Sequence, residues 1–284
     1  MKLALGTVQF GLDYGISNPR GKVNFAEVQS IISVAENASI NTFDTASSYG
    51  NSEAVLGEAL KGTEHCLGKI SPSTGPEHVL DEAKQSLKDL NIDKFECISA
   101  HHAQWLLDAN GQQNYQALLR IKQLGLSNKI GCSAYSVEEA RRLISQFDID
   151  VIQLPANLCD QQVLNKDFLA LCSANHIELH IRSLFLQGAL LMPLNDLPEH
   201  LKGLVSTGEL LDKLCIQKAV SKMALLLAPY VQHPNISKII VGCCSADELS
   251  EIVHAYQEAK NCEFNYQEFA IFDDNITNPS KWPN

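Results

Sequence analysis

The segment FDTASSYGNSEAVLG, residues 43–57, contains a strand end, a short polar loop and the start of a helix. The run NTFDTA (41–46) predicts a strand, and NSEAVLGEAL (51–60) has the apolar spacing of a helix. Asp44 therefore lies at the end of a strand, and Tyr49 lies in the loop that leads into the helix. The rest of the chain repeats this unit.

Strand-like runs alternate with helical patterns along almost the whole chain. The predicted strands are LALGT (3–7), NTFDTA (41–46), CLGKI (66–70), KFECISAHH (94–102), KIGCSAY (129–135), VIQLPAN (151–157), ELHIRSLFL (178–186) and SKIIVGCCS (237–245). Each is followed by a helical pattern, from FAEVQSIISVAENA (25–38) to ADELSEIVHAYQE (246–258), although an irregular stretch follows the seventh strand. Eight such units predict an α/β fold, a (β/α)8 TIM barrel with parallel strands inside and helices outside.

A doubly wound sheet is the alternative fold for such an alternation. It would usually carry a GxGxxG turn after the first strand, and GTVQFGLDYG (6–15) does not supply one. No linker or low-complexity segment interrupts the series. We therefore expect one barrel domain over residues 1–284, with a C-terminal tail from about residue 261.

Composition limits the possible partners. The 284 residues are 45% hydrophobic and 19% charged, and the net charge is −11, which disfavours binding to nucleic acid or to an anionic membrane surface. No run approaches the roughly 20 apolar residues of a membrane span, and the N-terminal sequence lacks the features of a signal peptide. These observations predict a cytoplasmic protein.

The cysteines follow neither a disulfide nor a zinc pattern. There are nine of them, an odd number, and no CxxC pair. We expect reduced, mostly buried thiols and no metal. Only the adjacent Cys243 and Cys244 suggest redox chemistry.

The barrel prediction gathers chemically active side chains at one place, because the C-terminal ends of all strands meet at one mouth. Asp44 ends the second strand and Tyr49 follows it, Lys69 ends the third, and His101 and His102 end the fourth. A carboxylate, a phenol, an ammonium and an imidazole are therefore expected to converge there.

Such a set is suited to proton transfer. A free tyrosine has a pKa of about 10, which a nearby ammonium lowers, while a carboxylate keeps that ammonium charged and oriented. A histidine beside them can donate a hydrogen bond to a carbonyl oxygen. The alternative is that Asp44 is a turn residue and Lys69 a solvated charge, and spacing alone does not exclude it.

The motif itself resembles the D-T-A-x-x-Y-G-x-S-E-x-x-L-G signature of the aldo-keto reductase superfamily. LALGTVQFG, LGKI, ISAHH, IGCSAYS, IQLPANLCD, IRSLFLQGAL and HPNISKIIVGCCSADEL resemble other segments of that family in the same order, over residues 3–255. The resemblance implies a (β/α)8 barrel that reduces a carbonyl compound, or oxidises the alcohol, with NADP(H) or NAD(H) and no metal. The implied substrate is a small carbonyl or sugar-like compound.

The resemblance also implies roles for individual residues. Tyr49 would be the general acid, Asp44 and Lys69 would tune it, and His101 would orient the carbonyl group. We favour His101 over His102 because strand side chains alternate, so that His101 shares a face with Cys97 and Ser99, which suit a barrel interior.

The implied cofactor and substrate residues lie on many strand ends. The cofactor set is Thr7, Asp44, Ser133, Gln153, Arg182, Ser183, Leu184, Gly242, Glu248 and Glu251, and the substrate set is Tyr14, Trp105 and Tyr135. Many relatives have a tyrosine at the position of Arg182, which can also stack flat on a ring, although a salt-bridged strand end is the alternative.

Two departures from the family pattern matter. The loop GCCSADELSEI (242–252) lacks the cations that usually bind the 2′-phosphate of NADP(H), so we expect NADH to be used at least as well as NADPH. The chain also starts at the first strand, apparently lacking the N-terminal hairpin, so side chains, the tail or another subunit would close the barrel floor.

Three questions stay open at this point. The aromatic tail could wall the substrate pocket or pack on the outer helices. The chain could be a monomer or a weak homo-oligomer. A catalytically weak nicotinamide-binding regulatory or scaffold subunit remains the alternative to an enzyme.

Overall fold

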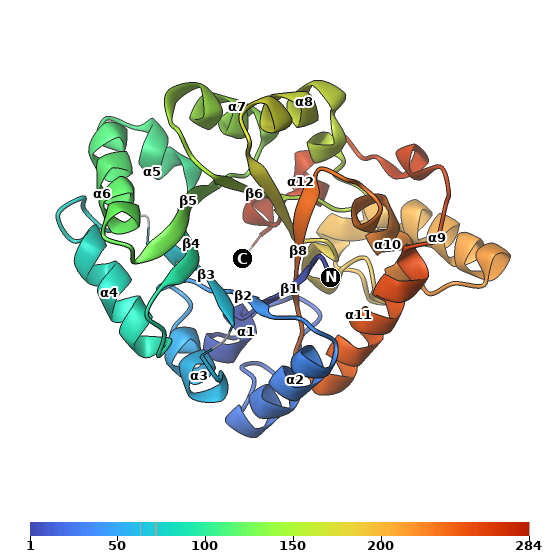
Figure 1. Ribbon diagram of the computed structural model, residues 1–284. Helices are drawn as coiled ribbons and strands as arrows, with labels where there is room; N and C mark the ends of the chain where they lie inside the picture. The colour runs from blue at the N-terminus through green and yellow to red at the C-terminus, as the bar shows by residue number, and fades with distance from the viewer. Residues whose placement is uncertain (63, 72, 284) are drawn as a thin grey trace.

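The computed structural model describes residues 1–62, 64–71 and 73–283. Its centre is a closed barrel of eight parallel strands in sequence order, β1 to β8 (Figure 1). The strands are β1 (Leu3–Gly6), β2 (Thr42–Asp44), β3 (His65–Ile70), β4 (Phe95–Ala100), β5 (Ser127–Ser133), β6 (Val151–Pro155), β7 (Glu178–Arg182) and β8 (Ile236–Gly242). The predicted (β/α)8 barrel is confirmed.

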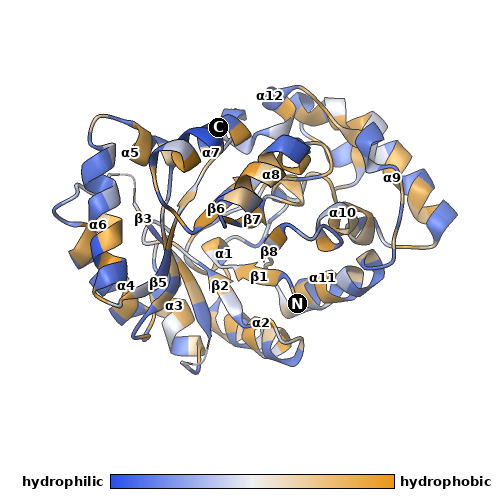
Figure 2. Ribbon diagram, turned by 45° about the horizontal axis from the view of Figure 1, so that its top comes forward, coloured by the Kyte–Doolittle hydropathy of each residue, from blue (hydrophilic) through white to orange (hydrophobic). Residues whose placement is uncertain are grey.

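Helices form a ring around the barrel, as Figure 1 shows end on. They are α1 (Val8–Gly11), α2 (Phe25–Asn37), α3 (Ser52–Ala59), α4 (Val79–Asp89), α5 (Ala103–Leu107), α6 (Gly111–Gln123), α7 (Val137–Gln146), α8 (Lys166–Ala174), α9 (Val205–Lys218), α10 (Lys222–Val231), α11 (Ala246–Ala259) and α12 (Asp274–Thr277). Short 3-10 turns lie at Gln162–Leu164, Leu186–Gly188, Leu194–Asp196, Glu199–Leu204, Tyr266–Phe269 and Pro279–Lys281. The helix ribbons in Figure 2 carry both hydrophilic (blue) and hydrophobic (orange) residues, as expected for elements with one face on the barrel and one in water.

Alternation along the strands divides the side chains between the barrel interior and the layer under the helices. On β2, Phe43 belongs to the large core under the helices, whereas Asp44 lines a cavity inside the barrel. Leu67, Cys97 and Val151 form a small apolar layer of their own, separate from the large core. Polar side chains lie on both sides of this layer.

Helix ends follow local capping signals. The side chains of Asn24, Ser136, Asn165 and Ser245 accept hydrogen bonds from the backbone N–H three residues on, at the starts of α2, α7, α8 and α11. Sequence patterns placed these helices within a few residues of their observed bounds.

The helical pattern that follows the irregular stretch to about residue 210 predicts one long helical region to about residue 232, but the structure has two helices there. Ala219, at φ 52°, ends α9, and Ser221 caps α10 by accepting from Ala224 N. The segments Glu199–Lys218 and Lys222–Val231 meet at a bend of 89°. Together they have the length and apolar composition of a broken membrane span, whereas no single helix in the described ranges has the length and composition of a span. The α10 residues from Ala224 to Val231 are buried inside the fold.

The C-terminal tail packs on the loops that follow β6 and β7. Ile271 N donates to Cys159 O, and Gln161 Nε2 donates to Tyr266 O, so the tail follows the loop after β6. Phe269 is buried against the core, while Phe272 is exposed. None of the described tail residues lines the cavity at the C-terminal ends of the strands.

All nine cysteines are free thiols, and Cys243 and Cys244 are not joined to each other. Most are buried, and burial raises the pKa of Cys66 and of Cys97 to about 12. These thiols are therefore protonated at neutral pH and behave as small apolar side chains.

Candidate active site

A cavity of about 470 Å³ opens at the C-terminal ends of the strands. Its lining combines side chains from β1, β2, β3, β5, β6, β7 and β8 with residues of the loops that follow them. The polar lining residues include Asp44, Tyr49, Lys69, His101, Ser133, Gln153 and Arg182. Asp44, Tyr49, Lys69 and His101, which were expected to converge from the strand ends, all line this cavity, whereas His102 does not.

Asp44 and Lys69 form a buried ion pair at the bottom of the cavity. Lys69 Nζ donates to Asp44 Oδ1 at 2.5 Å and to Thr45 O at 3.1 Å. Gln153 Nε2 donates to the other carboxylate oxygen, Asp44 Oδ2, at 2.8 Å. Burial opposes the ammonium form, but Asp44 and Tyr49 outweigh it, so the pKa of Lys69 lies above its usual value. Lys69 is therefore a fixed positive charge.

Tyr49 lies between Lys69 and His101. Lys69 Nζ is 5.4 Å from the centre of the Tyr49 ring, and the Tyr49 and His101 rings meet edge to face with their centres 5.5 Å apart. Burial raises the pKa of Tyr49, and Asp44 adds to that rise, whereas Lys69 lowers it. The expectation that Lys69 acidifies this phenol is right for its own contribution but wrong for the balance, because burial dominates.

His101 is a neutral imidazole. Burial, together with the charges of Lys69, His102 and Arg182, lowers its pKa to about 3. Ser48 Oγ lies 3.1 Å from His101 Nδ1. A hydroxyl that donates to Nδ1 leaves the proton on Nε2, where the ring can donate to a ligand.

His102 belongs to a stack beside the cavity. Its ring lies on Tyr135, with the centres 5.4 Å apart and 17° between the planes. Arg182 covers the same tyrosine, with Cζ 4.6 Å from the ring centre. Arg182 also donates to Ala134 O at 3.4 Å, so it is held by an aromatic ring and a carbonyl group, and no salt bridge of it is found in the described part of the chain.

A nicotinamide cofactor fits the buried polar groups of this cavity that have no hydrogen-bond partner in the protein. The buried oxygens Gln153 Oε1 and Gln9 Oε1 have no hydrogen-bond partner in the protein. Ser133 pairs with Gln153 in the strand register, so a hydroxyl and an amide lie side by side. Such a pair can bind a carboxamide group, which both donates and accepts.

The loop after β7 provides a backbone suited to an anion. Ser183, Leu186 and Gln187 have φ of 62°, 51° and 53°, an unusual backbone for residues other than glycine. Such turns form concave arrangements of N–H groups that bind phosphates. Across the cavity, a Cβ on Gly242 would come within 2.7 Å of Gln9 Nε2, so glycine keeps that wall open.

Two carboxylates cover the N-terminal end of α11. Glu248 Oε2 accepts from Cys244 N at 2.7 Å, and Glu27 Oε1 accepts from Ala246 N at 2.7 Å. These backbone N–H groups would otherwise be free to bind an anion at the helix start. The charge of Arg20 acts on this loop, where it lowers the pKa of Cys244 against the effect of burial.

Two of the residues expected at the site do not line the cavity. Two other residues that contribute to the site were not predicted from the sequence. Trp105 belongs to α5, where it is buried and its Nε1 donates to Thr74 O, and Glu251 on α11 is not part of the lining. Gln9 and Ser48 were not predicted. Ser48 stands inside the DTASSYG motif and could have been considered from its position next to Tyr49.

The sequence profile of the aldo/keto reductase family matches residues 2–274. The chain belongs to the aldo/keto reductase family. Its relatives include a NAD(P)H-dependent 6′-deoxychalcone synthase and an NADH-specific methylglyoxal reductase, which together with the family confirm the prediction of an oxidoreductase with a nicotinamide cofactor.

Individual similarities are low. A soybean (Glycine max) NAD(P)H-dependent 6′-deoxychalcone synthase is 29% identical over 163 residues, which cover 48% of this chain and 50% of that enzyme, so the match spans about half its length. L-glyceraldehyde 3-phosphate reductase of Escherichia coli O157:H7 is 23% identical, covering 93% of this chain and 88% of that protein. The fold of a Bacillus halodurans aldo-keto reductase in its holo form superposes with a TM-score of 0.75 at 17% identity, covering 99% and 95% of the two chains.

Proposed function

We propose that this protein reduces a small aldehyde or ketone with NADH or NADPH, or oxidises the corresponding alcohol, and that Tyr49 is the general acid and base. The observation that carries the proposal is the placement of Tyr49 between the buried Asp44–Lys69 pair and the neutral His101, at a cavity that fits a nicotinamide. The bound cofactor would supply the hydride.

The protein's own groups account for the proton. A tyrosine with a raised pKa stays protonated at neutral pH and can donate to the carbonyl oxygen as it gains negative charge. Lys69 stabilises the phenolate that remains, and Asp44 keeps Lys69 in place. A raised phenol pKa favours the acid role, and therefore carbonyl reduction, near neutrality.

His101 is suited to orient the substrate. Because its pKa is about 3, it adds no positive charge beside Tyr49 at neutral pH. An Nε2–H group can donate to the same carbonyl oxygen that takes the proton from Tyr49. Two donors at one oxygen fix the direction of the carbonyl group.

NADH is the proposed preferred cofactor. Glu27 and Glu248 already occupy the N–H groups of Ala246 and Cys244, where a 2′-phosphate would need positive or donating groups. A carboxylate repels a phosphate but accepts a hydrogen bond from a 2′-hydroxyl. Removing these charges should therefore help NADPH more than NADH.

Turnover with a panel of small aldehydes tests the activity. Tyr49→Phe should reduce kcat at least about 100-fold while leaving the dissociation constant for NADH nearly unchanged. Tyr256→Phe, which removes a hydroxyl bonded to Lys2 N on the outside of the barrel, is the matched control. Equal, near-zero rates for wild type and Tyr49→Phe would instead favour the regulatory or scaffold subunit.

Fluorescence titration with NADH and NADPH tests the cofactor preference. The wild type should bind NADH at least as tightly as NADPH, and Glu27→Gln with Glu248→Gln should shift the ratio toward NADPH. Tenfold tighter binding of NADPH by the wild type would contradict the proposal and would point to Arg20 as a phosphate ligand.

A further inference from the structure

A second cavity, of about 240 Å³, lies at the opposite end of the barrel, where the strands begin. Its lining residues are Asn41, Thr42, His65, Leu67, Glu96, Cys97, Lys129, Val151, Glu178, His180 and Lys238, none of which lines the cavity of Tyr49. The buried layer of Leu67, Cys97 and Val151 closes its inner end. The proposed carbonyl chemistry makes no use of this cavity.

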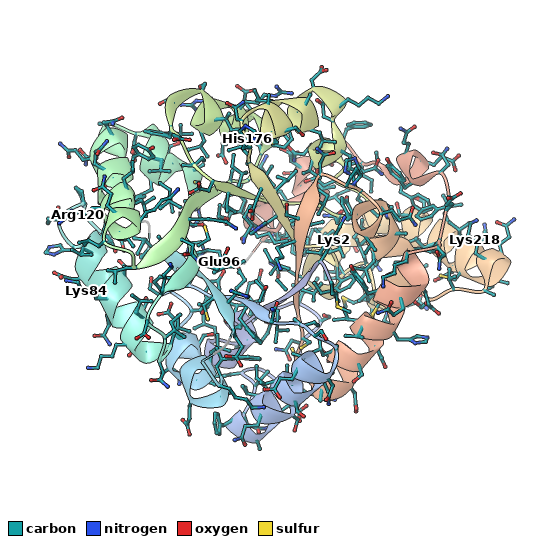
Figure 3. All side chains as sticks on the ribbon, in the orientation of Figure 1. Lys2, Lys84, Glu96, Arg120, His176 and Lys218 are labelled. Carbon is teal, nitrogen blue, oxygen red and sulfur yellow. The ribbon has the colours of Figure 1, made fainter. Side chains whose placement is uncertain are left out.

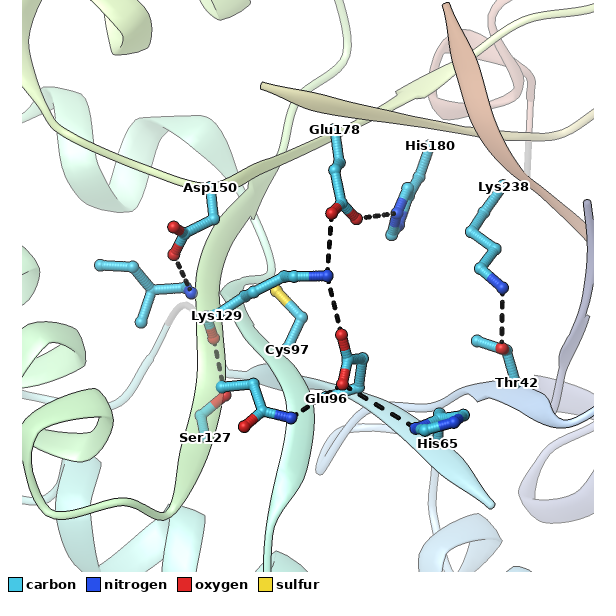
Figure 4. A network of polar contacts seen from close by, with 12 residues as sticks. Thr42, His65, Glu96, Cys97, Ser127, Lys129, Asp150, Glu178, His180 and Lys238 are labelled. Carbon is cyan, nitrogen blue, oxygen red and sulfur yellow. Dashed lines mark hydrogen bonds and ion pairs between the residues drawn. The ribbon is translucent and has the colours of Figure 1, made fainter. Parts of the chain in front are cut away.

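One wall of the cavity is an ion-pair network (Figure 4). Lys129 Nζ lies 2.7 Å from Glu96 Oε1 and 2.8 Å from Glu178 Oε1, so it bridges β4 and β7. Glu96 also accepts from Asn128 Nδ2 at 2.8 Å. Figure 3 shows Glu96 near the centre of the barrel, in contrast to Lys84, Arg120 and Lys218 at the periphery. This wall is already satisfied by its own partners.

The facing wall has hydrogen-bonding capacity left over. Lys238 Nζ donates to Thr42 Oγ1 at 3.0 Å, and no salt bridge of Lys238 is found in the described residues. His180 is 2% exposed, yet its Nε2 has no hydrogen-bond partner, and Glu178 Oε2 is 3.7 Å away. His180 and Lys238 are neighbours in the register of β7 and β8, so these two groups lie side by side.

We propose that this barrel floor binds a small carboxylate anion between Lys238 Nζ and His180 Nε2. An ammonium has three N–H donors and Lys238 uses one on Thr42, which leaves two for the anion. His180 Nε2 donates a third hydrogen bond when its ring is protonated. The cavity volume of about 240 Å³ equals that of roughly eight water molecules, so the site admits only a small anion.

The charges around His180 link the binding of this anion to a proton. Glu178 on the same strand, Lys238 on β8 and Asp44 on β2 face it, and burial together with Lys238 holds its pKa below the usual value against the two carboxylates. An anion in contact with Nε2 favours the charged imidazolium. Binding therefore takes up a proton and becomes tighter as the pH falls toward the pKa of the carboxylate itself.

A single charge suits the site better than a phosphate does. Lys129, Lys238, Glu96 and Glu178 sum to no net charge, so one proton on His180 balances one bound negative charge. A phosphate carries about −1.5 to −2 at pH 7 and would lie near Glu178 Oε2 without compensation. The same carboxylate disfavours any larger anionic charge.

Calorimetric titration of the full chain with sodium acetate tests the site. Sodium chloride at the same ionic strength is the reference, and two buffers with different ionisation enthalpies report the protons exchanged. We expect saturable binding of one acetate per chain, proton uptake at neutral pH, and tighter binding at about pH 6 than at about pH 8.

Two substitutions connect the signal to named residues. Lys238→Met should weaken acetate binding at least about tenfold, whereas Lys218→Met, on the exposed surface of α9, should leave it unchanged. His180→Gln should abolish the proton uptake and the pH dependence even where some binding remains. Circular dichroism spectra verify that each variant is folded.

Several results would overturn the proposal. These are heats for acetate equal to those for chloride, an unchanged affinity in Lys238→Met, or tighter binding of inorganic phosphate than of acetate. Binding of methylammonium in place of acetate would make this a cation site of Glu96 and Glu178. None of these measurements involves turnover, so they succeed or fail independently of the proposed reductase activity.

Discussion

Gln153 donates its amide N–H to Asp44 Oδ2 at 2.8 Å, on the opposite oxygen of the carboxylate from Lys69. The amide nitrogen is thereby fixed, and the amide oxygen is left without a partner in the buried wall of the cavity. One hydrogen bond thus sets both the geometry of the ion pair and the acceptor that a carboxamide group would meet. We therefore expect cofactor binding and proton transfer to be linked through Asp44.

Replacing Asp44 by Asn should lower both activity and stability. The change leaves the buried Lys69 without its counter-charge, which typically costs about 3 kcal/mol or more of unfolding free energy. Denaturant unfolding and aldehyde turnover measure the two effects, and Asp93→Asn in an exposed loop is the control. A variant as stable as the wild type would show that Lys69 finds another partner or loses its proton.

Replacing Ser48 by Ala should lower kcat for aldehydes with little change in NADH affinity, because His101 loses the hydroxyl at Nδ1 that selects its tautomer. Ser48→Thr, which keeps the hydroxyl, should restore most of the rate. If alanine and threonine variants behave alike, the contact with His101 has no part in orientation.

The rate of carbonyl reduction should be nearly independent of pH from about pH 5 to about pH 9. His101, whose pKa is about 3, is already neutral over this range, and the raised pKa of Tyr49 keeps the phenol protonated. The rate should fall only at higher pH, where Tyr49 ionises. A fall in kcat/KM centred near pH 6.5 that disappears in His101→Gln would assign a charged imidazole to the reaction instead.

Replacing Glu53 by Gln should stabilise the protein above pH 7. Burial raises the pKa of Glu53 to about 7, and Glu53 Oε1 has no hydrogen-bond partner. The native state then binds more protons than the unfolded state between about pH 4.5 and 7, so wild-type stability falls as the pH rises through this window. The variant lacks this loss, which amounts to roughly 3 kcal/mol.

Unfolding by urea at about pH 5 and about pH 8 measures the Glu53 effect. The advantage of Glu53→Gln should be small at the lower pH and large at the higher pH. Glu58→Gln, an exposed position on the same helix, provides the comparison. An advantage that does not grow with pH would mean that Glu53 ionises without penalty.

Much of the fold was predictable because apolar residues recur with a different spacing in strands and in helices, and because the strand–helix unit occurs eight times. The cavity could be placed as well, since the ends of parallel strands converge, and this brought Asp44, Lys69 and His101 together before any geometry was known. The alternation rule on β4 separated His101, which lines the cavity, from His102, which stacks on Tyr135.

Other features depend on long-range contacts that no local pattern reports. Glu27 and Ala246 are 219 residues apart, so the carboxylate at the start of α11 could not be read from the loop that it covers. The direction of the Tyr49 pKa depends on total burial, which sequence spacing does not give. The break at Ala219 was missed because neither proline nor glycine marks it.

Strand β7 contributes Glu178 and His180 to one rim and Arg182 to the other, all on the same side of the strand. Inserting or deleting a single residue between Glu178 and Arg182 would keep the side chains on one side of the change facing inward and turn those on the other side outward, so the two rims could not both keep their polar side chains. We therefore expect changes of length to be tolerated in the connecting loops, such as residues 183–204, and not within the strand.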